Sequence, residues 1–152
     1  MILEFCVSNY LSIKDELKIS FVATALKDVL TESNDMITVP DTGLFVLRSA
    51  VIYGANASGK SNFVRALDFM RRVTIMGSRA MRYDDRFFRI DPVCKEKPGV
   101  FQIDFVAEQT VFSYGFAINY LTHEFCAEWL YRRKKLVFLS ENTESKLQQT
   151  CD

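Results

Sequence analysis

Apolar and polar residues alternate along the N-terminal part of the chain. Leu3 and Phe5 alternate with polar or small neighbours, and the same period of two returns over 17–21, after a polar connection. A period of two places the apolar side chains on one face of a strand, so this pattern predicts a pair of strands. From 25 to 43 the chain is polar and rich in turn-forming residues, which predicts loops with a short strand at 36–39.

A mostly apolar segment, 44–53, follows these alternating segments. Such a run predicts a strand that is buried on both faces. Behind it the spacing becomes helical and predicts an amphipathic helix from about Lys60 to Met76, closed by Gly77. Its apolar side is formed by Phe63, Ala66, Leu67, Met70 and Val73. The charge-rich segment 78–99 reads as an exposed connection.

Alternation returns in the last third of the chain. The polar pair Glu108 and Gln109 separates two alternating runs and indicates a hairpin, and the basic segment 132–135 predicts a later turn. The polar residues 140–152 have little to bury, so we expect a disordered C-terminal tail. The four strands predicted here lie at 101–105, 112–118, 125–131 and 136–139.

Composition limits the classes of function. The 152 residues are 49% hydrophobic, which suits one globular domain with its own core. Lys plus Arg equals Asp plus Glu at 19 each, so no global charge supports binding to nucleic acid or to a membrane surface. No segment resembles a signal peptide or reaches membrane-spanning length, and we expect a cytoplasmic protein. The four cysteines, Cys6, Cys94, Cys126 and Cys151, are scattered, which favours reduced and mostly buried thiols.

The stretch VIYGANASGKSN, residues 51–62, carries the main functional signal. Gly54, Gly59, Lys60 and Ser61 fit the phosphate-binding pattern GxxxxGK(S/T), between a predicted strand and a predicted helix. The glycines allow the amides of residues 56–61 to point at a polyphosphate, helped by the positive end of the helix. Lys60 would supply a positive charge to the β- and γ-phosphates, and Ser61 would offer its hydroxyl to a magnesium ion.

The remaining loop residues fit the same interpretation. Asn56, Ala57 and Ser58 are small enough for the backbone to approach a phosphate closely. Asn62 could hydrogen-bond back to hold the shape of the loop, although a solvated helix position explains it equally well. These residues complete a predicted binding site for ATP and Mg²⁺.

Phosphoryl transfer also requires a carboxylate on a neighbouring strand to hold magnesium. The two runs that could supply one end at Asp104 and Glu141, and both are better explained as ordinary alternating strands. His123, the single histidine, reads as a solvated turn residue. A local group of arginines is mixed with aspartates and reads as a solvated face rather than a nucleic-acid groove. That group contains Arg71, Arg72, Arg79, Arg82, Arg86 and Arg89.

Several segments together resemble a known family. They are MILEFCVSNYLSIKDELKISFVA, LRSAVIYGANASGKSNFVRALDFM, FQIDFVAEQTVFSYGFAIN and EFCAEWLY. These segments resemble the N-terminal part of bacterial AAA-family ATP-binding proteins, which belong with the ATP-binding cassette heads of SMC, RecF and OLD-type ATPases. Many such proteins act in phage-defence or abortive-infection systems. The similarity covers residues 1–139, and IYGANASGKSN is its most specific piece.

The resemblance implies an α/β P-loop NTPase fold, specifically an ABC-ATPase-like first lobe. A mostly antiparallel subsheet, from 1–23 and 100–139, would pack beside the strand, loop and helix of 51–76. The resemblance implies a partial ATPase domain over 1–139 and ATP with Mg²⁺ bound by Gly54 and by residues 56–62. Ala57 departs from the glycine that relatives often have. The signature motif, Walker B carboxylates and switch histidine belong to a C-terminal lobe for which this chain has no room.

Three interpretations remain open at this point. The chain is an ATP-binding lobe whose hydrolysis needs a second lobe and dimerisation across the nucleotide. Alternatively, it is a non-catalytic interaction module that docks to a full-length partner through strand edges or an apolar surface. Third, the isolated lobe folds poorly, because its buried strand would lack neighbours on one side.

Overall fold

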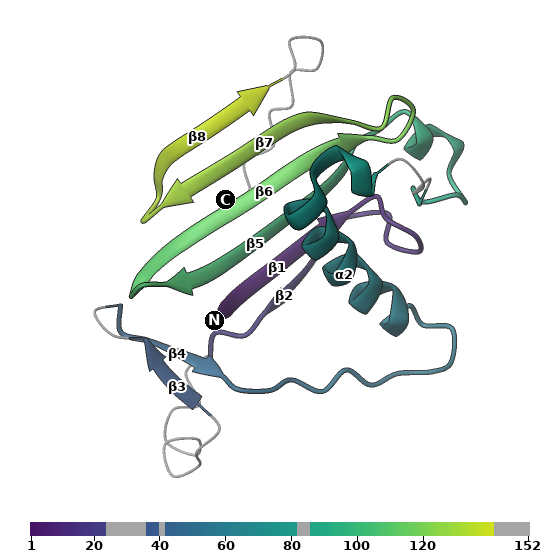
Figure 1. Ribbon diagram of the computed structural model, residues 1–152. Coiled ribbons are helices and arrows are strands. Elements are labelled where there is room, and N and C mark those ends of the chain that lie inside the picture. Colours follow the sequence, from purple (N-terminus) through teal and green to yellow (C-terminus); the bar gives the residue numbers. More distant parts are fainter. Residues whose placement is uncertain (24–35, 40–41, 82–85, 142–152) are drawn as a thin grey trace.

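A six-stranded antiparallel sheet forms the body of the protein (Figure 1). The computed structural model describes residues 1–23, 36–39, 42–81 and 86–141. In the sheet the strand order is β2-β1-β5-β6-β7-β8, and β3 and β4 pair with each other in a separate hairpin. The strands are β1 (Ile2–Ser8), β2 (Leu17–Ser20), β3 (Met36–Val39), β4 (Leu44–Leu47), β5 (Gly99–Ala107), β6 (Thr110–Asn119), β7 (Glu124–Arg132) and β8 (Lys135–Glu141).

Tight turns explain the regular path from β5 to β8. Glu108 and Gln109 form the whole connection between β5 and β6, and both have positive φ, at 48° and 58°. Arg133 and Lys134 connect β7 to β8 in the same way, with φ of 47° and 62°. Two-residue turns of this hand match the twist of antiparallel strands. The predicted hairpins are therefore confirmed, and β8 extends to Glu141, beyond its predicted end.

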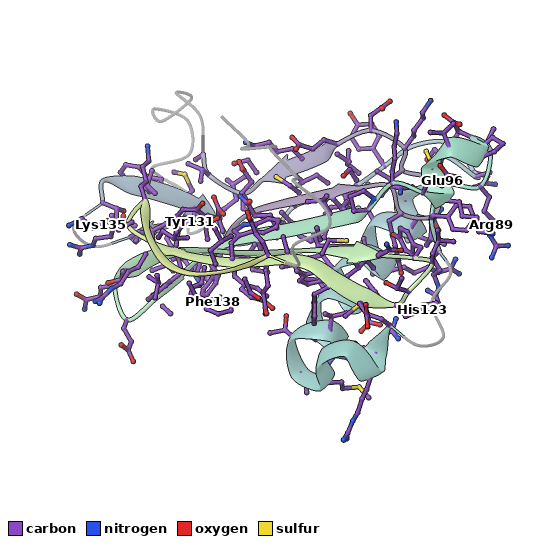
Figure 2. The ribbon with its side chains drawn as sticks, turned by 90° about the horizontal axis from the view of Figure 1, so that it is seen from above. Arg89, Glu96, His123, Tyr131, Lys135 and Phe138 are labelled. Atoms are coloured by element: carbon purple, nitrogen blue, oxygen red, sulfur yellow. The ribbon has the colours of Figure 1, made fainter. Side chains whose placement is uncertain are left out.

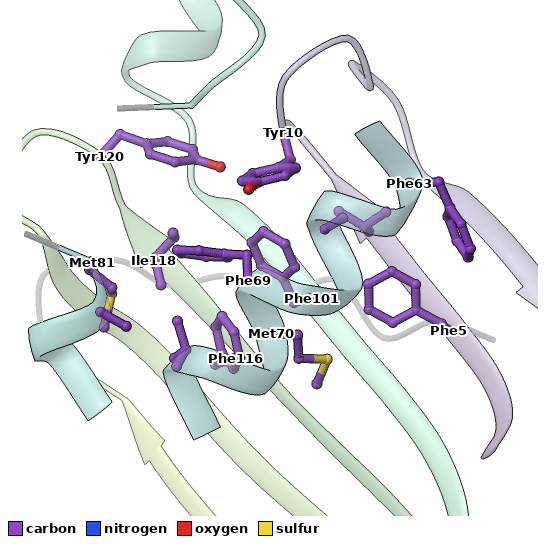
Figure 3. Close-up of a cluster of buried hydrophobic side chains, with 14 residues drawn as sticks. Phe5, Tyr10, Phe63, Phe69, Met70, Met81, Phe101, Phe116, Ile118 and Tyr120 are labelled. Carbon is purple, nitrogen blue, oxygen red and sulfur yellow. The ribbon is translucent and has the colours of Figure 1, made fainter. Parts of the chain in front are cut away.

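A long helix, α2 (Lys60–Met76), covers one face of the sheet (Figure 1). Its buried side chains pack against apolar residues of β1, β5 and β6. Phe69 lies 5.1 Å from Phe101 and 5.3 Å from Tyr10 between ring centroids, which places an aromatic cluster at the centre of the core (Figure 3). The helix ends at Gly77, whose φ is 61° and whose amide bonds to the carbonyl of Val73, as the sequence predicted.

The β3–β4 hairpin packs at the end of the sheet where β1 begins. Leu3 lies in a small buried cluster with Val39 and Val46. The chain after β2 links the two sheets, because the amide of Leu47 bonds to the carbonyl of Phe21 at 2.8 Å. The short strand predicted at 36–39 is confirmed as β3. Residues 24–35 and 40–41 of the predicted loop region lie outside the described residues.

The strand predicted over 44–53 is wrong in its second half. β4 ends at Leu47, and residues 51–53 form no strand. Val51 is 85% exposed and Tyr53 is 91% exposed, although both were expected in the interior. Among the described residues, β4 pairs with β3 and bridges to Val22, and nothing pairs with 51–53. A lone extended segment cannot satisfy its backbone groups inside a core, so it lies on the surface.

The connection after α2 is more ordered than the sequence suggested. It contains two 3-10 helices, η1 (Gly77–Ala80) and η2 (Pro92–Lys95), and it buries Met81 and Cys94. Asn9, at the end of β1, holds this segment in place. Its side-chain amide donates to the carbonyls of Cys94 at 2.7 Å and Lys97 at 2.8 Å. The prediction of a fully exposed connection over 78–99 is therefore wrong for these parts, while residues 82–85 lie outside the description.

Two further expectations concern cysteines and membranes. Cys6, Cys94 and Cys126 are buried and form no disulfide, as predicted, and Cys151 lies outside the described residues together with the rest of 142–152. In the described part of the chain no helix combines the length and the apolar character that crossing a membrane requires.

Candidate functional site

The loop 54–59 joins the exposed segment 51–53 to the start of α2. One weak turn bond closes it, from the amide of Ser58 to the carbonyl of Ala55 at 3.3 Å. In residues 56–61, the five other backbone amides have no acceptor among the described residues. They are the amides of Asn56, Ala57, Gly59, Lys60 and Ser61. The loop therefore has free donors for an external acceptor.

The ammonium group of Lys60 lies against this loop. Its Nζ donates to the carbonyl of Gly54 at 2.7 Å and to the carbonyl of Ala55 at 2.6 Å, with a longer contact of 3.4 Å to Ser58 Oγ. The Lys60 side chain thus folds back over the loop that precedes it in the sequence. A positive charge and a set of free amides are brought together within six residues.

The N-terminus of α2 adds to this positive potential. Gly59 is the N-cap residue, with φ of 93°, and no side chain caps the helix. The first turn contains no acidic residue that would neutralise the helix dipole. Uncapped N–H groups at a helix N-terminus bind anions well, and phosphate is the common biological case. The N–H groups at the N-terminus of α2 therefore lack hydrogen-bond acceptors, and a phosphate group could supply them.

Gly59 is also favoured by a close contact with the β1–β2 turn. A Cβ atom at this position would lie 3.0 Å from Ser12 Oγ. The same Ser12 hydroxyl accepts a hydrogen bond from Asn62 Nδ2 at 2.8 Å. Asn62 thus reaches to a distant turn and not back to its own loop. Ser12 could not be predicted as a partner of this site, because fifty residues separate it from Asn62.

Ala57 occupies an unusual backbone position. Its φ is 63°, in the left-handed region that favours glycine. A glycine at this position would adopt this conformation without strain. Ser61, the predicted magnesium ligand, is exposed at the first turn of α2, where its hydroxyl is open to solvent.

The two carboxylates that could have completed a magnesium site lie elsewhere. Asp104 belongs to β5, next to Ile103, which packs in the core under α2; the alternation of a strand turns Asp104 to the opposite face. There it accepts hydrogen bonds from Ser113 at 2.6 Å and Gln102 at 3.3 Å. Glu141 ends the exposed edge strand β8. The interpretation of both as ordinary strand residues agrees with this placement.

Charged and phenolic groups near α2 have structural explanations. Hydrogen bonding to Arg71, with the nearby charge of Arg72, holds the pKa of Asp68 below its usual value. Burial raises the pKa of Tyr114, and its hydrogen bond to Glu128 at 2.7 Å acts in the same direction. In the described part of the chain no cluster of three metal-ligating side chains occurs. The bonds of these groups lie within α2 and between β6 and β7.

Comparison with known families agrees with the geometry of the loop. The family model described as "AAA domain, putative AbiEii toxin, Type IV TA system" matches residues 49–137, which include the loop, α2 and strands β5 to β7. The match covers more than half of the 152 residues. No curated protein matches the chain significantly. The chain therefore belongs to this family of AAA domains, which supports a nucleotide-binding, ATPase-like module with a mostly antiparallel sheet.

Proposed function

We propose that this domain binds ATP with Mg²⁺ through residues 54–62. The observation that carries the proposal is the position of the Lys60 ammonium beside five free amides at an uncapped helix N-terminus. In the bound state the ammonium would exchange the loop carbonyls for β- and γ-phosphate oxygens. Ser61 would ligate magnesium from the first turn of α2. The backbone from Gly54 to Gly59 would surround the phosphates.

Asn62 has a supporting role in this proposal. Its bond to Ser12 fixes the first turn of α2 relative to the β1–β2 turn, so the amides keep their direction. Binding groups that are already in position lose less conformational entropy when a ligand binds.

Calorimetry with Mg-ATP tests the assignment. Lys60→Ala removes a charge-assisted contact of about 1.5–3 kcal/mol, so the affinity should fall by about 10- to 150-fold. Lys135→Ala, at the start of β8, removes the same charge from an exposed strand end and should leave the affinity unchanged. Ser61→Ala should reduce the gain in affinity that magnesium gives over a chelator. Equal affinities for wild type and Lys60→Ala would refute the site.

We further propose that the domain is an SMC/RecF/OLD-like first lobe. The resemblance of 1–139 to such proteins supports this, as does the placement of Asp104 and Glu141 away from the loop. Hydrolysis would then require a second lobe or dimerisation across the nucleotide. The family description names an AbiEii toxin and a type IV toxin–antitoxin system, which supports a role in defence of this kind. Unaided ATP turnover by a monomer, measured as phosphate release with light scattering, would contradict the requirement for a second lobe.

An interaction module is the second candidate function, and one surface feature favours it. An apolar groove of about 730 Å³ runs between α2 and the sheet, lined by residues that include Val64, Ile75, Phe105 and Leu130. Val64 and Ile75 are 61% and 69% exposed, so the groove leaves apolar surface open to solvent. Size-exclusion chromatography with and without ATP separates the two functions. An oligomer that forms regardless of nucleotide would favour the module.

A further inference from the structure

A second cavity lies near the β6–β7 turn. Its volume is about 330 Å³, at the lower end of the range for pockets that bind small ligands. In Figure 2, Arg89 and His123 lie at one end of the molecule, and Tyr131 and Lys135 lie at the other. The cavity is lined by Phe87, Arg89, Lys95, Tyr120, Leu121 and His123.

The walls of this cavity are held by the fold. Tyr120 is buried, and its hydroxyl donates to the carbonyl of Asn9 at 2.6 Å. Asn119 fixes the turn that follows, because its side-chain oxygen accepts from the amides of Leu121 at 2.7 Å and Thr122 at 3.2 Å. The amide of His123 bonds back to the carbonyl of Asn119 at 2.9 Å. The turn therefore presents His123 in a defined position.

The rest of the cavity lining comes from the segment after α2. The side chain of Asp91 caps η2 by accepting from the amide of Val93 at 3.1 Å, and η2 carries Lys95. Phe87 packs on Tyr120 with 6.0 Å between ring centroids. Residues from two distant parts of the sequence thus meet around one hollow.

The charged side chains that line the cavity are all positive. Arg89 and Lys95 are cationic, His123 offers ring nitrogens for hydrogen bonds, and none of the six lining residues carries a carboxylate. Asp91, close by in sequence, is paired with Lys14 at 2.9 Å. The rest of the lining is aromatic or aliphatic. Such a surface attracts an anion that also has a flat apolar part.

We propose that this cavity binds a phosphate-bearing ligand of the nucleoside monophosphate class. Its phosphate would contact Arg89, Lys95 and His123, and its base would lie against Phe87 and Leu121. The ligand could be a free nucleotide or the phosphorylated end of a single strand, because both present the same chemical group. Guanidinium and ammonium groups are the usual partners of phosphate in proteins.

This site is separate from the loop at 54–59 and goes beyond the function proposed for it. The β1–β2 turn lies between them: Ser12 contacts Asn62 of α2, while the amide of Leu11 bonds to the carbonyl of Arg86 at 2.6 Å. No loop residue lines the cavity. Loss of binding at one site should therefore leave the other intact.

The single histidine of the chain gives a direct test, since His123 is the only source of an imidazole resonance in the NMR spectrum. AMP is titrated into the Lys60→Ala variant, in which the loop site is disabled. We expect a saturable shift of the His123 resonance, with a weaker response to inorganic phosphate because it lacks a base. Failure of the loop assignment, measured separately on wild type with Mg-ATP, would not alter this result.

Variants decide whether the cations act as proposed. Arg89→Ala and Lys95→Ala should each weaken AMP binding by about 10-fold or more, the lower end expected for a charge-assisted contact. Arg133→Ala, in the β7–β8 turn, is the matched control and should leave it unchanged. A short 5′-phosphorylated oligonucleotide that shifts His123 at lower concentration than AMP would identify a strand end as the source. The absence of a saturable shift with both ligands, or binding that survives both alanine variants, would overturn the proposal.

Discussion

Because Ala57 has a left-handed conformation, we predict that replacing it by glycine stabilises the protein, although alanine-to-glycine substitutions usually destabilise. Replacing alanine by glycine normally destabilises a protein by about 0.4–1 kcal/mol, because the unfolded chain gains freedom. At φ of 63°, however, an L-residue with a Cβ atom carries strain of about 1–2 kcal/mol, and glycine removes it. Ala57→Gly should therefore raise the free energy of unfolding by about 0.5–1 kcal/mol. For a chain of this size that corresponds to a rise in Tm of about 1–4 °C.

Ala55 provides a matched control in the same loop. Its φ is not positive, so Ala55→Gly gains no relief of strain and should destabilise by about 0.4–1 kcal/mol. Comparing the two variants cancels the effect on the unfolded chain. The difference of about 1–2 kcal/mol measures the left-handed strain alone. Urea unfolding without nucleotide gives both values, and equal destabilisation by the two substitutions would refute a left-handed residue at 57.

Three further predictions concern other parts of the structure. Asn9→Ala leaves the carbonyls of Cys94 and Lys97 without their side-chain donor and should cost at least about 2 kcal/mol in urea unfolding. At Gly115 a new Cβ would meet the Trp129 ring, so Gly115→Ala should cost about 1–3 kcal/mol, and much less when Trp129 is also replaced by alanine. The bond from Lys14 lowers the pKa of Asp91, so this carboxylate contributes stability above the ordinary carboxyl pKa of 3.8 and loses it as pH falls through the folded value. Thermal unfolding of Asp91→Asn should accordingly show a smaller loss of stability on acidification than wild type.

Each of these has a result that would contradict it. Wild-type stability of Asn9→Ala would show that water replaces the side chain at the carbonyls. An unchanged cost of Gly115→Ala in the Trp129→Ala background would mean that the ring does not cover the glycine. Parallel acid unfolding curves for wild type and Asp91→Asn would show that the pair with Lys14 is not formed in solution.

Local features of the sequence predicted the elements that depend on local physics. The bounds of α2 follow from Gly59 and Gly77, which both have positive φ and mark the ends of an apolar stripe. The hairpins from β5 to β8 follow from a period of two broken by two-residue turns. The phosphate-binding pattern could be read for the same reason, since its residues are adjacent in the chain.

Long-range pairing could not be predicted in this way. Apolar content over 44–53 indicated burial, but burial requires a partner strand, and none of the described segments supplies one for 51–53. The placement of β1 between β2 and β5 likewise depends on contacts about a hundred residues apart, such as Phe5 opposite Ile103. Ser12 and the cavity around His123 were missed because their neighbours come from distant segments.

The exposed segment 51–53, before the loop, makes the chain accessible to proteolysis. A protease that cleaves after aromatic residues should reach Tyr53 readily, because both its side chain and its unpaired backbone are open to solvent. The pieces on either side would stay together, because β1 in the first piece is inserted beside β5 in the second. The two pieces should therefore assemble when they are produced as separate polypeptides, and a ligand held by the loop would slow the cleavage that separates them.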